Sequence, residues 1–185
     1  MRLFLALETP EALAADLLAT LPALPAIPAH GGLRPVPAAQ CHLTLRFLGE
    51  CDVDSAARIV TAMATLAPRE IVLTVQGTGR FRPRQGAVLW AGLAPNAALD
   101  ALRQDVDVAL AMAGVAADTR PFKPHLTLAR CGPAVPEAVQ RQWLSRTAAL
   151  ATPAWQAQRV VLFESQLHAT GAVHRIHATS ALHNG

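Results

Sequence analysis

The tetrapeptide His-Leu-Thr-Leu occurs twice in this chain of 185 residues, at 42–45 and again at 125–128. In each copy polar and apolar residues alternate, which is the pattern of a strand that is buried on one face only. The leucines of each copy would enter a core beneath the sheet, while the histidine and the threonine stand together on the opposite face. If the two copies belong to halves related by a pseudo-two-fold axis, their polar faces meet across one cleft.

The order of the expected elements also repeats around these two strands. Each part of the chain reads as strand, helix, strand, helix, strand, and the second part adds one more strand. Pro10 stands at the first position of the first helix, and Asp52 can cap the second. A proline-rich loop to about Gln40 precedes the first motif strand. The expected strands are 2–7, 42–48, 71–76, 87–93, the second motif, 159–165 and 172–178, and the expected helices are 10–21, 52–66, 96–114 and 136–150.

The composition indicates one compact globular unit. Hydrophobic residues make up 52% of the chain and charged residues only 16%, which excludes a disordered polyelectrolyte. The length suits a single two-lobed domain over residues 1–185. Its approximate halves are residues 1–78 and 86–185, joined by a basic turn at 79–85.

Charge and cysteine content narrow the class of protein further. The formal net charge of +3 permits an anionic substrate, but no dense basic stripe of the kind that binds duplex nucleic acid is visible. Three cysteines without a C-x-x-C pair argue against a disulfide framework or a structural zinc site, so a reducing cytoplasm is the expected location. Glu8 interrupts the apolar N-terminal run, which therefore reads as a strand and not as a signal peptide, and no membrane association is expected.

The bare pattern His-x-Thr is weak, because the chain contains it four times. Only the copies at His42 and His125 continue into leucine and are followed closely by an arginine. The copies at His168 and His177 lack both features, and together with His174 and His183 these histidines are interpreted as surface residues of a terminal hairpin. A metal site at His174 and His177 is not expected, because no carboxylate or cysteine ligand lies nearby in the sequence.

Longer segments around the two motifs resemble a known family. The stretches "HLTLRFLGE", "RPFKPHLTLAR", "RLFLAL" and "LFESQLHATG" are similar to the two-histidine phosphoesterase superfamily, in particular to its bacterial RNA 2',3'-cyclic phosphodiesterase branch, also called 2'-5' RNA ligase. The resemblance covers nearly the whole chain. It implies a bilobal α+β fold with two antiparallel sheets around a central cleft and helices outside, and chemistry without a metal or another cofactor.

The resemblance also implies roles for individual residues. His42 becomes the proton donor and His125 the proton acceptor, while Thr44 and Thr127 bind nonbridging phosphate oxygens. Arg130 matches the arginine that follows the second motif in the family and is expected to stabilise charge. From strand parity alone, Arg46 shares the face of His42 and is a further candidate for phosphate contact. His174 stands where the family commonly has an aromatic residue, often tyrosine.

The main functional hypothesis is hydrolysis of an RNA terminal 2',3'-cyclic phosphate to a 2'-phosphomonoester. The expected partners are RNA ends or nucleotides that carry this group, and no obligate protein partner is evident. Two alternatives stay open: 2'-5' RNA ligation at the same site, and a noncatalytic RNA-binding module that uses the positive surface. A basic turn around Phe81 could contact RNA phosphates, although a solvated turn is the favoured interpretation. The arginines of this basic turn are Arg80, Arg82 and Arg84.

Phe47, which follows the first motif, is interpreted as a core residue.

Overall fold

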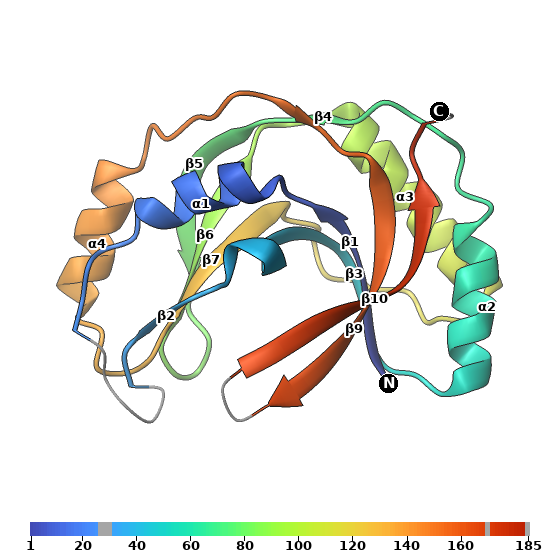
Figure 1. Ribbon diagram of the computed structural model, residues 1–185, viewed down its shortest axis with the longest axis horizontal. Coiled ribbons are helices and arrows are strands. Elements are labelled where there is room, and N and C mark those ends of the chain that lie inside the picture. The colour runs from blue at the N-terminus through green and yellow to red at the C-terminus, as the bar shows by residue number, and fades with distance from the viewer. Residues whose placement is uncertain (26–30, 169–170, 184–185) are drawn as a thin grey trace.

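The computed structural model describes residues 1–25, 31–168 and 171–183 (Figure 1). The expected strand–helix order is present, with two short strands that were not expected, one at Leu33–Pro35 in the proline-rich segment and one at Trp155–Gln156. The helices are α1 (Glu11–Ala19), α2 (Val53–Met63), α3 (Ala97–Met112), α4 (Glu137–Arg146) and a 3₁₀ turn at Ala38–Gln40. The strands are β1 (Arg2–Glu8), β2 (Leu33–Pro35), β3 (His42–Glu50), β4 (Val72–Leu73), β5 (Val75–Phe81), β6 (Ala87–Leu93), β7 (His125–Cys131), β8 (Trp155–Gln156), β9 (Arg159–His168) and β10 (Gly171–Ala181).

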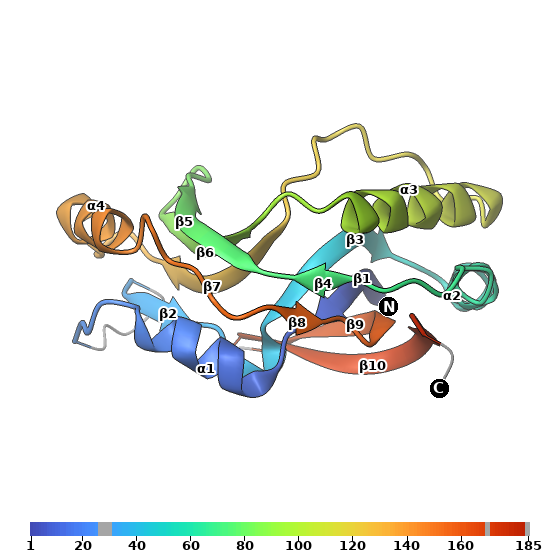
Figure 2. The same ribbon diagram turned by 90° about the horizontal axis from the view of Figure 1, so that it is seen from above.

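The two motif strands, β3 and β7, lie next to each other in the middle of a large antiparallel sheet. The strand order is β10-β9-β1-β3-β7-β6-β5, with β2 also paired to β7 and with β4 and β8 forming a separate small sheet. β3 and β7 share a single pair of Cα partners, Leu43 and Leu126. The sheet therefore consists of two antiparallel halves joined at one point, with helices on the outside (Figures 1 and 2). The predicted α+β class is confirmed.

The strands are shared between the two halves differently from the predicted division into residues 1–78 and 86–185. β5 pairs with β6, and the C-terminal strand β9 pairs with β1, with β10 added at the outer side of β9, so that neither strand extends the second half. The pairing of β5 with β6 has a local reason: β5 continues to Phe81, and a short turn returns the chain directly along β6. Gly86 ends that turn with φ +74, where a Cβ atom would collide with the carbonyl oxygen of Cys131.

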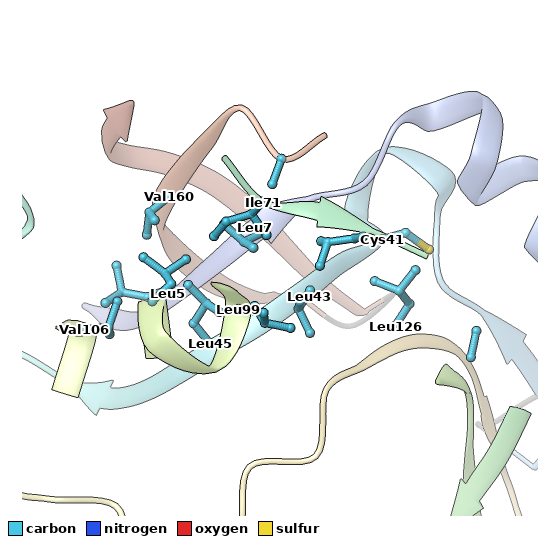
Figure 3. Packing of buried hydrophobic residues seen from close by; sticks show 14 of the residues in the cluster. Leu5, Leu7, Cys41, Leu43, Leu45, Ile71, Leu99, Val106, Leu126 and Val160 are labelled. Atoms are coloured by element: carbon cyan, nitrogen blue, oxygen red, sulfur yellow. The ribbon is translucent and has the colours of Figure 1, made fainter. Parts of the chain in front are cut away.

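The leucines of both motifs enter the core as predicted. Leu43 and Leu126 are 1% and 0% exposed, and burial of a leucine side chain is worth about 1.5 to 3 kcal/mol. Figure 3 shows them packed with leucines of β1 and with residues of α3, which covers the sheet. Asp52 caps α2 as expected by accepting a hydrogen bond from the Ser55 amide, and Asn96 caps α3 by accepting one from the Leu99 amide.

Candidate active site

The polar faces of β3 and β7 line one cleft of about 840 Å³ between the halves of the sheet. The structure brings together five of the six predicted site residues here: His42, Thr44, His125, Thr127 and Arg130. Leu43 and Leu126, the one pair of Cα partners between β3 and β7, are the middle residues of the two His-Leu-Thr triplets. The histidine and the threonine of each motif therefore flank the point where the two strands meet.

A β-bulge interrupts both motif strands at the same motif position, the second leucine. On β3 the partners along β1 jump from Thr44 to Arg46, and on β7 the partners along β6 jump from Thr127 to Ala129. A bulge inserts one residue and reverses the alternation of faces beyond it. The residue after each bulge is therefore buried, and the residue after that one returns to the cleft side.

The bulge explains why the prediction for Arg46 is wrong. The Arg46 side chain is 4% exposed and lies on the core side, where it forms ion pairs with Asp107 at 3.1 Å and Asp118 at 4.0 Å. It also donates a hydrogen bond to the carbonyl oxygen of Ala116. It does not line the cleft. Arg46 therefore holds β3 against α3 and the segment that follows α3, and a phosphate role is not available to it.

The same bulges place two other side chains in the cleft. Arg130 is exposed and lines the cleft, as the family resemblance implied. Phe47 occupies the equivalent place on β3 and is 58% exposed, so the interpretation of Phe47 as a core residue is wrong. Strand parity alone would have placed both residues on the core face.

Both histidine rings are held in the same tautomer by the same local contact. Nδ1 of His42 lies 2.7 Å from the carbonyl oxygen of Gln40, and Nδ1 of His125 lies 2.7 Å from that of Lys123. A carbonyl oxygen only accepts hydrogen bonds, so Nδ1 carries the proton and donates it. In the neutral ring this leaves Nε2 as the atom that can accept a proton, and in the charged ring Nε2 is the atom that can give one.

Burial and neighbouring charges favour the neutral form of both rings. Desolvation, followed by the nearby His174, lowers the pKa of His42 to about 4, although the hydrogen bond to Gln40 opposes this effect. Desolvation also lowers the pKa of His125, and the charge of Lys123 adds to that effect. Both rings are thus poised as bases in the substrate-free protein.

Aromatic rings surround each histidine. The ring of His42 lies 4.8 Å from Phe4, 5.8 Å from Phe163 and 5.4 Å from His174, measured between ring centroids. On the other side of the cleft, Phe81 lies 4.9 Å from His125. These aromatic rings exclude water from one side of each imidazole, and this desolvation lowers the pKa of both histidines.

His174 is a cleft residue that sequence reasoning missed. It lines the cleft beside His42, its Nδ1 is buried without a hydrogen-bond partner among the described residues, and burial lowers its pKa. The interpretation of His174 as a surface residue is therefore wrong, whereas His168 and His177 are exposed as expected. The signal that could have found it was its place at the usual aromatic position of the family. Thr170 of the His168 pattern lies outside the described residues.

Three other features of the surroundings bear on the chemistry of the cleft. The arginines of the basic turn do not line the cleft, and Arg80 and Arg82 form ion pairs with Glu137. Burial raises the pKa of the Cys41 thiol to about 11, so the thiol next to His42 is not a nucleophile at neutral pH. Within residues 1–25, 31–168 and 171–183, no group of three or more metal-binding side chains comes together.

Comparisons with known proteins agree with this geometry. The family model described as the 2'-5' RNA ligase superfamily matches residues 7–169. The RNA 2',3'-cyclic phosphodiesterase of Geobacillus stearothermophilus is 33% identical over 136 residues, which cover 70% of this chain and 41% of that protein. The protein of the same name from Aeropyrum pernix is 35% identical over 91 residues, which cover 48% and 52%. The chain thus spans about half the length of these curated relatives.

Solved structures with the same fold include two bacterial proteins. Escherichia coli LigT complexed with 3'-AMP matches with a TM-score of 0.74 at 23% identity, over 99% of this chain and 98% of that one. TT0787 of Thermus thermophilus matches with a TM-score of 0.73 at 24% identity, over 98% of both chains. At these identities the likeness establishes the fold. In the described part of the chain, no helix has the length and apolar character that a membrane crossing requires.

Proposed function

The chain belongs to the 2'-5' RNA ligase superfamily, and from this membership we propose that it hydrolyses the 2',3'-cyclic phosphate at an RNA end to a 2'-phosphomonoester. Residues 1–185 act in this proposal as a single two-lobed phosphoesterase domain. The observation that carries it is the placement of both histidine–threonine pairs in one cleft, with Nε2 of each ring left for proton transfer. The curated relatives that carry the name RNA 2',3'-cyclic phosphodiesterase support the choice of substrate.

The residues of the cleft account for every proton transferred in the proposed reaction. One imidazole takes a proton from water through Nε2 while the water oxygen forms a bond to phosphorus. The bond between phosphorus and O3' breaks, and the other histidine, as imidazolium, gives its Nε2 proton to that oxygen. The product carries a 2'-phosphomonoester and a free 3'-hydroxyl. Thr44, Thr127 and Arg130 donate hydrogen bonds to the nonbridging oxygens, whose charge increases in the transition state.

The division of roles between the histidines is a separate part of the proposal. His42 as donor and His125 as acceptor stays a prediction, and the lower pKa of His42 in the substrate-free protein counts against it. A donor must take up its proton together with the anionic substrate, because an opposite charge nearby raises the pKa of an imidazole. This requirement is harder to meet at His42.

A substrate with sulfur in place of the bridging O3' decides which histidine is the donor. A thiolate leaves without protonation far more readily than an alkoxide, since a thiol has a pKa of about 8.5. Replacement of the donor by alanine should therefore be rescued by the sulfur substrate, and replacement of the acceptor should not. Rescue of His42→Ala alone supports the predicted roles, and rescue of His125→Ala alone reverses them.

Product analysis tests the reaction itself. We expect the protein to convert an oligonucleotide with a 2',3'-cyclic end to the 2'-phosphate, and His42→Ala or His125→Ala to lower the rate about 10²- to 10⁴-fold. The exposed histidines provide matched controls: His168→Ala and His177→Ala should stay within about tenfold of the wild type. A control variant as slow as His42→Ala would show that the wrong pair was chosen.

The same assay separates the alternatives. Joining of a cyclic-ended strand to a 5'-hydroxyl strand without hydrolysis would favour 2'-5' ligation, in which a ribose hydroxyl replaces water. Binding of RNA with no covalent change, unaffected by either histidine substitution, would favour a noncatalytic RNA-binding module.

A further inference from the structure

Two arginines stand opposite each other at the outer end of the cleft. Arg34 on β2 and Arg130 on β7 are Cα partners in the antiparallel pairing of these strands, and both side chains line the cleft. Residues directly opposite in an antiparallel pair project from the same face, with Cβ atoms about 5 Å apart. Like charges in this arrangement repel each other and destabilise the sheet.

No carboxylate among the described residues compensates either charge. Neither Arg34 nor Arg130 forms an ion pair there, whereas Arg120, which also lines the cleft, is paired with Asp118 at 2.8 Å. Among the residues that the structure describes, no acidic side chain lines this cleft. Two neighbouring guanidinium groups without a counter-charge form a site that an anion stabilises, and a phosphate diester suits their planar, hydrogen-bonding shape.

The backbone of β2 holds Arg34 firmly in this position. The Val36 amide donates a hydrogen bond to the carbonyl of Leu128 at 2.8 Å, and the Gly132 amide donates one to the carbonyl of Gly32 at 2.9 Å. The short strand is thus tied to β7 on both sides of Arg34. Leu128 is the bulged residue without a Cα partner on β6, and its carbonyl oxygen accepts its hydrogen bond from β2 instead.

The two arginines differ in their position relative to the catalytic rings. The charge of Arg130 contributes to the lowered pKa of His174, so its guanidinium acts toward His174, which lines the same cleft. Arg34 comes from the outer strand β2. Arg34 shares the register position of Arg130, which lies three residues beyond Thr127, a distance of about 10 Å along a strand, but of the two charges it is that of Arg130 that acts on His174. An RNA strand whose cyclic end contacts Thr127 would bring its next phosphate toward this end of the cleft.

We propose that Arg34 binds the phosphodiester that joins the terminal nucleotide to the rest of the RNA, while Arg130 serves the cyclic phosphate. The proposal rests on the proposed function and specifies its substrate class: an oligonucleotide end makes a contact that a cyclic mononucleotide cannot make. The protein therefore discriminates in favour of RNA ends over free cyclic nucleotides, and Arg34 is a specificity residue.

The test compares Arg34→Gln with a matched control, Arg146→Gln, which removes one exposed arginine from α4 outside the cleft. We measure kcat/KM on a cyclic-ended trinucleotide and on 2',3'-cyclic AMP over a range of salt concentrations. Arg34→Gln should lower kcat/KM about tenfold for the trinucleotide and less than about twofold for the mononucleotide. The salt dependence for the trinucleotide should weaken by about 0.7 in logarithmic slope, the value for one lost contact to a single strand. Arg146→Gln should change neither value.

A neutral methylphosphonate at the linkage before the terminal nucleotide identifies the phosphate concerned. The wild type should lose about as much activity on this substrate as Arg34→Gln loses on the normal one, and the two changes together should cost little more than either alone. Equal losses on the trinucleotide and the mononucleotide would place Arg34 at the cyclic phosphate and overturn the proposal. Unchanged activity on both substrates, or additive losses, would overturn it as well.

Binding separates this proposal from the proposed function. A fluorescent trinucleotide that ends in a 2'-phosphate reports affinity by anisotropy without any reaction. If the protein hydrolyses no cyclic end but binds this probe about tenfold more weakly after Arg34→Gln, the phosphate contact holds and the hydrolase proposal fails. If the protein hydrolyses the cyclic end and Arg34→Gln does not change the affinity for the probe, the hydrolase proposal holds and the proposed contact of Arg34 with the phosphodiester is wrong.

Discussion

Around His42, a set of aromatic rings and one short hydrogen bond act in opposite directions on the same imidazole. Phe4 and Phe163 desolvate the ring, while the carbonyl of Gln40 stabilises its proton on Nδ1. Desolvation dominates, and it lowers the pKa to about 4. The folded protein therefore holds His42 neutral at pH values at which the unfolded chain, with an imidazole pKa of about 6.5, already binds a proton.

This difference makes folding stability depend on pH. Between the two pKa values the unfolded state binds more protons, so the contribution of His42 to stability falls as the pH falls from about 6.5 toward 4. We expect a loss of about 2 kcal/mol from this residue between pH 7 and pH 5. Urea unfolding of the wild type and of His42→Asn at both pH values measures it, because the asparagine amide keeps a donor for Gln40.

The wild type should lose more stability than His42→Asn on acidification, and the difference between them isolates His42 from the other titrating groups. Two of those groups, His125 and His174, also have lowered pKa values and remain in both proteins. Equal losses in the two proteins would show that His42 is not held neutral by its surroundings.

At the level of strands, the paired bulges decide which residues reach the cleft. Each bulge leaves the histidine and the threonine of the motif on the polar face. The residue directly after the bulged leucine then points into the core. On β3 that residue is Arg46, and on β7 it is Ala129, both of which are buried. The same bulge, present in both halves, thus moves to the core the residue that simple alternation would place in the cleft, and moves the next residue from the core to the cleft.

Replacement of Arg46 should affect stability and not substrate binding. Arg46→Ala removes a buried guanidinium and leaves Asp107 and Asp118 without that partner. We expect a loss of about 2 to 4 kcal/mol in the free energy of unfolding, measured with urea. Well below the melting temperature, KM should stay close to the wild-type value. A raised KM with unchanged stability would return Arg46 to the phosphate site. Arg82→Ala, which removes an exposed ion pair, is the control and should change the urea midpoint little.

Gly79 controls the packing of β5 against the wall of the cleft. It lies opposite Trp90, and a Cβ atom there would overlap the indole ring. That indole packs against Phe81 and the ammonium of Lys123, next to His125. Gly79→Ala should therefore displace the ring and cost about 1 to 3 kcal/mol in urea unfolding.

A second-site change tests whether the indole is the cause of that loss. Trp90→Leu leaves room for the added methyl group, so Gly79→Ala should cost less in the Trp90→Leu background than in the wild type. Equal costs in both backgrounds would mean that strain in the backbone, and not the indole, causes the effect.

For the whole molecule, function depends on how two half-sheets meet. β3 and β7 share one pair of Cα partners and then diverge, which opens the cleft on the polar side while the leucines keep both halves on one core. The site draws its residues from β1, β2, β3, β7, β9 and β10. Among the described residues, neither half contains a complete set of groups for the proposed chemistry.

Catalysis by this cleft should not require a metal ion. The proposed steps use imidazole, hydroxyl and guanidinium groups, and no step needs a Lewis acid. We expect hydrolysis of a cyclic-ended trinucleotide to proceed at full rate in excess EDTA, and added magnesium or zinc not to increase it. Loss of activity in EDTA with recovery after addition of a divalent ion would contradict paired acid–base catalysis.

The features that could be predicted from the sequence depend on neighbouring residues in the chain. Alternation in His-Leu-Thr-Leu places histidine and threonine opposite leucine, because successive side chains in a strand point to opposite faces. The caps at Asp52 and Asn96 need only their own helix, and both form. The two histidines of the candidate site, the α+β class and the family all follow from such local patterns.

The remaining site residues depend on pairing between distant strands. The bulges that bury Arg46 and expose Phe47 arise from the register with β1, and Arg34 reaches the cleft because β2 pairs with β7, a strand far along the chain. His174 joins His42 because β9 pairs with β1 and β10 pairs with β9. A single-residue shift in pairing changes the face of a side chain without changing its local sequence, so these positions are decided by the tertiary fold.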